Sequence, residues 1–222
     1  MKIIAHRGFS ANYPENTMLA FEKALDAGVD GIETDLRLSL DEHAIIFHDD
    51  TLKHITGVDK VPESLSLAEL KELNAGQGQK IPTLDELLQL TSSKATLILE
   101  IKYNETTYER LCEVIEEMIK DKLNWVEVSC FEDCVLEYMH KLNSEIKLHK
   151  LIEKASIIED KGFEKKYAYA SYFDIDAKLK KRVLELGLLQ RHKIIFWTVD
   201  AEDISQEERA GLYGIMRNDP TL

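Results

Sequence analysis

The sequence is poor in cysteine and contains no long apolar run. Three cysteines occur in 222 residues (Cys112, Cys130 and Cys134), and this small odd number predicts reduced thiols rather than a disulfide framework. The opening residues 1–6 are too short in apolar length for a signal peptide, and no later stretch reaches the length of a membrane span. We therefore expect a cytoplasmic protein without stable membrane insertion.

Basic residues are also scarce. The 28 lysines and arginines are outnumbered by 41 aspartates and glutamates, which gives a net charge of −13 at pH 7. This surplus of negative charge argues against nucleic acid or an anionic membrane as a broad partner. A small anionic substrate stays compatible, because a metal ion with a few arginines or lysines reverses the field inside one cleft. The oligomeric state is left open.

Short apolar runs typical of strands alternate with helical patterns along the whole chain. We predict nine strands, at residues 3–5, 31–38, 44–47, 96–99, 125–129, 146–151, 167–172, 193–199 and 212–216. This alternation favours a closed parallel (β/α)8 TIM barrel over an open doubly wound sheet. Such a barrel has eight slots, so one strand is expected to be a hairpin arm or an irregular edge.

The barrel is predicted to form a single domain over residues 1–222, with a short irregular insertion around 49–82. Asn16 is the expected N-cap of a helix that ends at Gly28. Thr83, with Glu86 three residues later, predicts a capping box. Further helices are expected at 66–70, 108–119, 135–142 and 178–186.

Charged residues close or directly follow four of the predicted strands. In a TIM barrel the C-terminal ends of the strands share one mouth, where active sites lie. We therefore expect these side chains to converge on one site. The groups are His6-Arg7-Gly8, Glu33-Thr34-Asp35, His48-Asp49 and Glu100-Ile101-Lys102.

Glu33, Asp35 and Glu100 are candidate metal ligands. Glu33 and Asp35 are two apart on one strand and face the same side, while Glu100 comes from a later strand. Oxygen ligands alone favour one divalent cation, Mg²⁺ or Ca²⁺, over zinc. The alternative is that Glu33 and Asp35 only pair with Arg37 or nearby lysines, which the other charged strand ends disfavour.

His6 and His48 are the candidate acid and base, in an order that the sequence leaves open. Imidazole titrates near neutral pH, so one ring can take a proton from an attacking hydroxyl while the other donates to a leaving oxygen. Arg7 and Lys102 are candidate substrate-binding residues, because their charge stabilises a phosphodiester transition state. The other histidines are assigned to structure or surface: His43, His54, His140, His149 and His192.

Two aromatic residues on later strands are candidates for the pocket wall. Trp197 could contact the substrate, although core packing explains it equally well, and Phe131 has the same ambiguity. Gly8 is expected to permit a sharp turn at the end of the first strand.

Taken together, these motifs resemble the glycerophosphodiester phosphodiesterase family. The match is dense up to residue 102 and scattered afterwards. The segments that carry it are His6-Arg7-Gly8, Pro14-Glu15-Asn16-Thr17, Ile32-Glu33-Thr34-Asp35, His48-Asp49, Ile81-Pro82-Thr83-Leu84-Asp85-Glu86-Leu87-Leu88, Glu100-Ile101-Lys102 and Phe196-Trp197-Thr198-Val199.

The resemblance implies a TIM barrel and a Mg²⁺- or Ca²⁺-dependent hydrolase. Such enzymes cleave small-molecule glycerophosphodiesters into sn-glycerol 3-phosphate and an alcohol. Attack of the glycerol 2-hydroxyl on phosphorus would give a cyclic phosphate that water then opens. The implied roles are metal binding by Glu33, Asp35 and Glu100, acid–base catalysis by His6 and His48, and phosphate binding by Arg7 and Lys102.

Some segments depart from the family pattern. Leu52-Lys53-His54-Ile55-Thr56 stands where the family carries Leu-x-Arg-Thr-Thr, and Arg217-Asn218 replaces Thr-Asp near the C-terminal end. These departures bear on substrate preference, and Arg217 could supply a second anion contact. Two alternatives stay open: a lysophospholipase D-like enzyme acting on lipids, which needs an apolar entrance, and a catalytically silent barrel used for binding.

Overall fold

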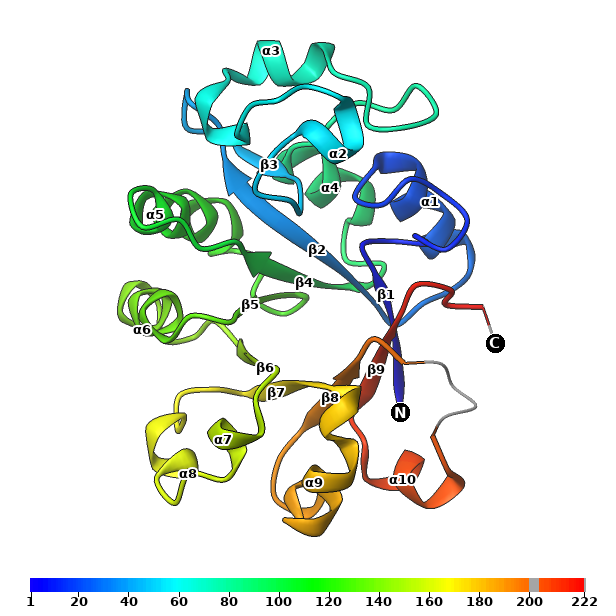
Figure 1. Ribbon diagram of the computed structural model, residues 1–222, viewed down its shortest axis with the longest axis vertical. Coiled ribbons are helices and arrows are strands. Elements are labelled where there is room, and N and C mark those ends of the chain that lie inside the picture. Colours follow the sequence, from blue (N-terminus) through cyan, green and yellow to red (C-terminus); the bar gives the residue numbers. More distant parts are fainter. Residues whose placement is uncertain (200–203, 222) are drawn as a thin grey trace.

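The computed structural model describes residues 1–199 and 204–221. Eight parallel strands close into a barrel, with β1 paired to both β2 and β9, and the helices lie outside the ring of strands (Figure 1). The predicted single-domain TIM barrel is confirmed. The barrel strands are β1 (Lys2–His6), β2 (Gly31–Leu38), β4 (Thr96–Ile101), β5 (Val126–Cys130), β6 (Leu148–Ile152), β7 (Tyr172–Asp176), β8 (Ile194–Trp197) and β9 (Gly214–Arg217).

One strand lies outside the barrel and is the arm of a hairpin, as nine predicted strands for eight barrel positions indicated. β3 (Ala44–Ile46) pairs antiparallel with β2 and takes no place in the barrel. The backbone N–H of Phe47 then donates to the carbonyl of Asp35 at 3.0 Å. The hairpin therefore returns the chain to β2 beside Asp35, which is where His48 follows.

Helices connect most of the strands. In the described part of the chain, no helix combines the length and apolarity needed to cross a bilayer. The α-helices are α1 (Met18–Asp26), α2 (Lys53–Thr56), α3 (Leu67–Glu72), α4 (Leu84–Thr91), α5 (Tyr108–Ile119), α6 (Asp133–Leu142), α7 (Ala155–Ile158), α8 (Phe163–Lys166), α9 (Lys180–Glu185) and α10 (Gln206–Gly211). The short 3₁₀ helices within the described residues are η1 (Pro62–Ser64), η2 (Ala177–Leu179) and η3 (Leu188–Gln190).

The N-termini of α4 and α1 test the predicted caps. α4 begins with the predicted capping box, in which the Thr83 side chain accepts from the N–H of Glu86 and the Glu86 carboxylate accepts from the N–H of Thr83. The prediction for α1 is wrong by one residue, because Thr17 is the N-cap and accepts from the N–H of Ala20. Asn16 instead has a left-handed backbone, and its side chain points to β2.

The predicted strand at 167–172 is also wrong. Tyr167 is the C-cap residue of α8, and β7 begins only at Tyr172. The alternation of tyrosine and alanine in this stretch imitates a half-buried strand. In the fold, however, the Tyr167 ring packs on Phe163, with ring centroids 5.5 Å apart, as neighbours one helical turn apart do.

The chain between β3 and α4 packs around a small core of its own. In this stretch α2, η1 and α3 lie over the β2–β3 hairpin, away from the centre of the barrel (Figure 1). Their buried apolar side chains meet those of the hairpin, and this contact fixes the segment from which His48 emerges. The members are Ile45, Phe47, Leu52, Leu65, Leu70, Ala75 and Ile81.

A charged triad is buried inside the barrel. His149 of β6 lies 2.9 Å from Glu127 of β5 and 3.0 Å from Asp174 of β7. Burial opposes a charge on His149, but the two carboxylates together raise its pKa to about 9. Burial opposes ionisation of Glu127 as well, yet hydrogen bonds from His149 and Lys147 lower its pKa to about 2. His149 is therefore an imidazolium at neutral pH.

Candidate active site

Strand register brings the predicted site residues to one end of the barrel. His6 of β1 lies beside Glu33 of β2, and Asp35 of β2 lies beside Glu100 of β4. A cleft of about 130 Å³ opens above Asp35, which is itself 1% exposed. The residues that line the cleft are His6, Arg7, Glu33, His48, Glu100, Lys102, Phe131, Leu151, Trp197 and Met216.

Three carboxylates meet at the base of this cleft. One oxygen from each of Glu33, Asp35 and Glu100 lies within 4.8 Å of the other two. Burial and then the charges of Asp35 and Glu100 raise the pKa of Glu33 well above its ordinary value. Burial and the charge of Asp35 likewise raise the pKa of Glu100 to about 7. The cluster therefore resists full ionisation unless additional positive charge is supplied.

The carboxylate cluster suits a hard divalent cation. In the described residues, the buried Oδ1 of Asp35 makes no hydrogen bond, and its ion pair with the Lys102 ammonium is long, at 3.5 Å. A buried carboxylate oxygen without a hydrogen bond, placed among other carboxylates, is chemically suited to coordinate a cation. Oxygen donors are those that Mg²⁺ and Ca²⁺ prefer. Glu33, Asp35 and Glu100 could thus hold one such ion.

Arg7 is placed by an unusual turn at the end of β1. Its backbone is left-handed (φ 56°), and its N–H donates both to the carbonyl of Glu33 at 3.0 Å and to the Glu33 carboxylate at 3.1 Å. The guanidinium donates to Glu15 at 2.9 Å and lies 3.4 Å from Asp35. Gly8 completes the turn (φ 76°), where a Cβ would come within 2.8 Å of the Ala20 backbone.

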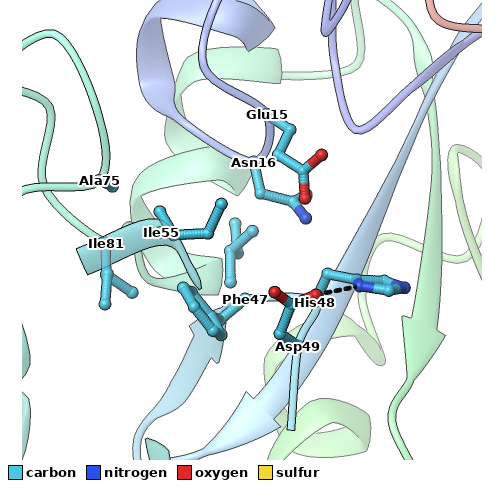
Figure 2. A pocket seen from close by; sticks show the side chains of 9 residues that line it. Glu15, Asn16, Phe47, His48, Asp49, Ile55, Ala75 and Ile81 are labelled. Carbon is cyan, nitrogen blue, oxygen red and sulfur yellow. Dashed lines mark hydrogen bonds and ion pairs between the residues drawn. The ribbon is translucent and has the colours of Figure 1, made fainter. Parts of the chain in front are cut away.

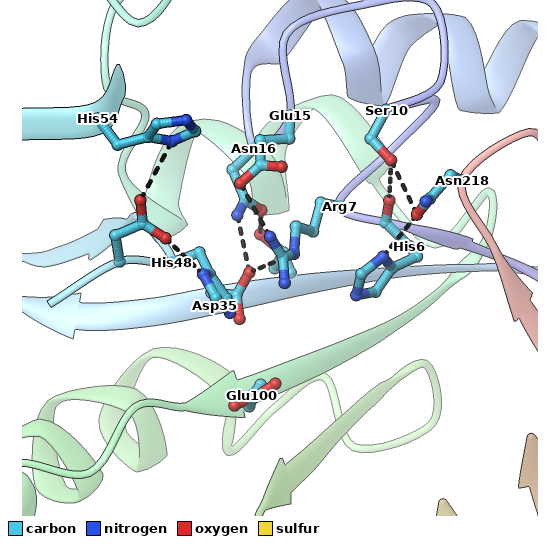
Figure 3. A network of polar contacts seen from close by, with 12 residues as sticks. His6, Arg7, Ser10, Glu15, Asn16, Asp35, His48, His54, Glu100 and Asn218 are labelled. Atoms are coloured by element: carbon cyan, nitrogen blue, oxygen red, sulfur yellow. Dashed lines mark hydrogen bonds and ion pairs between the residues drawn. The ribbon is translucent and has the colours of Figure 1, made fainter. Parts of the chain in front are cut away.

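Asn16 is a site residue that the sequence interpretation missed. Its side-chain amide donates to Asp35 Oδ2 at 2.8 Å, and its carbonyl oxygen accepts from the Thr34 hydroxyl at 2.8 Å (Figure 3). The first bond orients the Asp35 carboxylate, and the second holds the Asn16 side chain in place. The signal in the sequence was an asparagine directly before the helix. Asparagine is one of the few residues with a Cβ that tolerates a left-handed backbone, and Asn16 has a φ of 55°.

His6 is held from the far end of the chain. Its Nδ1 lies 2.7 Å from Asn218 Oδ1, and its Nε2 is 3.9 Å from Glu33 (Figure 3). Since the amide oxygen only accepts, Nδ1 carries the ring proton and Nε2 has the lone pair. Burial and the charge of Arg7 lower the pKa of His6. Asn218, a departure from the family pattern, thus contacts a predicted acid–base residue.

His48 is positioned by charged neighbours behind it. Its Nδ1 lies 2.8 Å from Asp49, and Asp49 also lies 3.6 Å from His54. The Arg37 guanidinium donates to the His48 carbonyl at 3.0 Å and forms its ion pairs with Asp50 and Glu63, so the alternative pairing of Arg37 with Glu33 and Asp35 is wrong. A small cavity of about 10 Å³ lies next to this turn, between Asn16, Phe47 and Ile55 (Figure 2). It has room for about one water molecule.

The remaining predicted residues complete the walls of the cleft. The Lys102 ammonium donates to Glu100 at 2.7 Å. Trp197 and Phe131 both line the cleft, with their rings edge to face 5.8 Å apart, and the Trp197 indole donates to the carbonyl of Asp174 at 3.0 Å. On β9, Met216 lines the cleft, whereas its neighbour Arg217 is outside the lining.

Comparisons with known proteins point to one enzyme family. A sequence model described as the Glycerophosphoryl diester phosphodiesterase family matches residues 6–222. A glycerophosphodiester phosphodiesterase from Caldanaerobacter subterraneus subsp. tengcongensis is 33% identical over 98% of this chain and 94% of its own length. One from Bacillus altitudinis is 35% identical over 66% of this chain and 64% of its own length.

Solved structures of similar proteins share the barrel. An Oleispira antarctica phosphodiesterase in complex with the product sn-glycerol-3-phosphate has a TM-score of 0.87 and 26% identity, covering 100% of this chain and 94% of that one. A glycerophosphodiester phosphodiesterase from Thermotoga maritima has a TM-score of 0.85 and 25% identity, covering 100% and 96%. The sequence and the fold thus agree: this chain belongs to the glycerophosphoryl diester phosphodiesterase family and is a phosphoric diester hydrolase.

Proposed function

We propose that the protein hydrolyses glycerophosphodiesters to sn-glycerol 3-phosphate and an alcohol, with one divalent cation and with His6 and His48 as acid and base. The observation that carries this proposal is the carboxylate cluster at the base of a cleft that also holds both imidazoles. The similar phosphodiesterase of Oleispira antarctica was solved with sn-glycerol-3-phosphate as its product, which supports this substrate class.

In this proposal, the charged residues of the cleft divide into two sets. Glu33, Asp35 and Glu100 would hold the cation, which when bound supplies positive charge against the anionic diester. Arg7 and Lys102 bind the non-bridging phosphate oxygens and stabilise the negative charge that grows on them. Burial disfavours the charge on Lys102, but Glu100 and Asp35 raise its pKa, so it stays an ammonium at neutral pH.

The imidazoles move the protons. His6 Nε2, the ring nitrogen with the lone pair, takes the proton of the glycerol 2-hydroxyl as its oxygen bonds to phosphorus. His48, whose Nδ1 lies 2.8 Å from Asp49, gives a proton to the alcohol oxygen as that P–O bond breaks. Water then opens the cyclic phosphate with the roles reversed, which restores both rings and releases sn-glycerol 3-phosphate.

The proposal extends to the rest of the chain. Trp197 forms the apolar wall against which the substrate lies. Residues 1–222 act as one catalytic domain, with residues 49–82 as an insertion that supports His48.

The substrate is a small molecule, and the protein acts in the cytoplasm. The free thiols of Cys112, Cys130 and Cys134 fit such a reducing setting.

Removing and restoring the cation tests the proposal. Purified protein is treated with excess EDTA, and release of sn-glycerol 3-phosphate from a glycerophosphodiester is measured before and after adding Mg²⁺ or Ca²⁺. We expect activity to vanish with the chelator and to return with at least one of the two ions. Full activity in excess EDTA would remove the cation from the mechanism.

A matched pair of variants locates the ion. Glu100→Gln should raise the cation concentration that gives half-maximal activity by at least about tenfold, since a neutral amide is a weaker ligand for a hard cation. Glu105→Gln, an exposed glutamate shortly after β4, should leave this concentration unchanged. The same concentration in both variants would contradict the assignment of Glu100.

A further inference from the structure

A second, larger cavity adjoins the candidate active site. It has a volume of about 420 Å³, against about 130 Å³ for the site cleft, and it opens where β5 and β6 end. Phe131 and Leu151 line both spaces. The two therefore meet along these side chains at the same mouth of the barrel. We refer to the larger one as the β5–β6 cavity.

We propose that the β5–β6 cavity binds the alcohol part of the diester and selects polyhydroxylated alcohols over quaternary ammonium alcohols. This inference rests on the proposed function, because only a phosphodiester has a second substituent to place. With the phosphate and the glycerol in the cleft of about 130 Å³, that substituent must lie in adjoining space. The shared wall at Phe131 and Leu151 makes the β5–β6 cavity such a space.

The charges of the cavity favour an electron-rich polar ligand at one end. The Asp133 carboxylate pairs with two ammonium groups, Lys150 at 2.7 Å and Lys166 at 2.6 Å. One carboxylate between two ammonium groups leaves a surplus positive charge. Lys150 is only 3% exposed, but Lys166 is 52% exposed. The Lys166 ammonium can therefore donate a hydrogen bond to a hydroxyl oxygen without breaking the buried pair.

Acceptors line the same cavity near its rim. Within residues 1–199 and 204–221, the exposed Glu132 makes no ion pair, so its carboxylate is available to accept from a hydroxyl. Glu153 lies 3.6 Å from Lys154, a loose and exposed pair. A polyol presents both donors and acceptors, so it matches a cavity lined by ammonium groups and carboxylates together.

Two aromatic residues line the cavity: Phe131, which packs edge to face with Trp197 at 5.8 Å between ring centroids, and Tyr167, which is already covered by cations. The ammonium groups of Lys150 and Lys166 lie 5.4 Å and 5.0 Å from the centre of the Tyr167 ring. A quaternary ammonium ligand needs a free aromatic face. Here it would meet two positive charges at that ring, so choline-type alcohols are disfavoured.

Kinetics with two substrates test the inference. We expect kcat/KM of the cation-loaded wild-type protein to be at least about tenfold higher for glycerophosphoinositol than for glycerophosphocholine. Lys166→Met should lower this preference roughly three- to tenfold, the effect of one lost hydrogen bond to a charged donor at an exposed site. Most of the change should appear in KM for glycerophosphoinositol, because the reacting atoms lie elsewhere.

Two further variants serve as controls. Lys166→Arg keeps the positive charge and should retain most of the preference, whereas Lys165→Met, an exposed neighbour on α8 outside the cavity, should leave it unchanged. Equal kcat/KM for the two substrates, or the same preference in Lys166→Met as in wild type, would overturn the cavity assignment alone. Hydrolysis of neither substrate would overturn the proposed function together with it.

Discussion

Two residues with a left-handed backbone position the charges of the site. Arg7 and Asn16 have φ values of 56° and 55°, a conformation that costs about 1–2 kcal/mol for a residue with a Cβ. In both residues hydrogen bonds offset this cost: the N–H of Arg7 bonds to Glu33, and the amide of Asn16 bonds to Asp35. Backbone strain of this kind is concentrated at functional sites, where the placement of a side chain outweighs the conformational energy of its backbone.

At the residue scale, the sequence indicated the charged groups but not their supports. The convergence of four charged residues could be predicted because each follows an apolar run typical of a strand. These residues are His6, Glu33, Asp35 and Glu100. Asn218 could not, because its bond to His6 depends on how the last strand meets the first across the closed barrel. No local pattern encodes that register.

Replacement of His48 tests its role in proton transfer. His48→Gln should lower kcat by about 10²–10⁴-fold, the usual contribution of a general acid or base. The cation affinity should stay close to that of wild type, because the carboxylates are unchanged. Steady-state kinetics combined with calorimetric titration of Mg²⁺ or Ca²⁺ would check both expectations.

His54 provides the matched control for His48. It also contacts Asp49, at 3.6 Å, but its side chain is 83% exposed and lies outside the cleft. His54→Gln should therefore change kcat by no more than about threefold, as expected for an exposed ion pair. A wild-type rate in His48→Gln, or an equal loss in both variants, would contradict the assignment.

At the scale of elements, the turn between β1 and α1 links packing to the site. Gly8→Ala would force a Cβ to within 2.8 Å of the Ala20 backbone in α1, at a φ of 76°. The turn must then shift, and Arg7 shifts with it. We expect the free energy of unfolding to fall by more than about 2 kcal/mol and kcat/KM to fall as well, measured by urea denaturation and by kinetics.

Gly28 separates backbone strain from steric clash. It has nearly the same φ, 73°, but a Cβ there would meet no atom within 4 Å. Gly28→Ala should cost only the conformational strain, about 1–2 kcal/mol, and leave kcat/KM unchanged. Equal stability losses in the two variants would show that the approach to Ala20 has no energetic consequence.

The elements that the sequence predicted correctly are those with a strong local signal. The capping box at Thr83 and the apolar runs of β1, β2 and β4 fall where expected. The prediction for 167–172 failed because the spacing fits a strand, whereas Tyr167 ends a helical turn and contacts Asp133 of α6 and Phe173 of β7. Propensity is a weak guide where neighbouring elements supply most of the packing.

At the scale of the whole molecule, the buried triad makes stability depend on pH. The pKa of His149 rises from 6.5 to about 9 on folding, so its stabilisation is full below pH 6.5 and is lost as the pH rises through 9. Because His149→Gln leaves the buried Asp174 without its cation and Glu127 with Lys147 alone, we expect a loss of about 3–5 kcal/mol at pH 7. The difference from wild type should shrink by pH 10, as urea denaturation at both values would show.

An exposed histidine controls for this experiment. His43→Gln replaces a ring that is 53% exposed and 3.9 Å from Asp41. Its effect on the free energy of unfolding should stay within about 0.5 kcal/mol at both pH values. A pH-independent difference between His149→Gln and wild type would show that His149 is not charged in the folded protein.

The hydrogen bond between His6 and Asn218 joins residues 212 positions apart. β1 is synthesised before β9, so the His6 imidazole stays unoriented until β9 docks beside β1. In the proposed mechanism, a folding intermediate that lacks β9 therefore has no oriented acid–base residue at position 6, and activity requires the closed barrel.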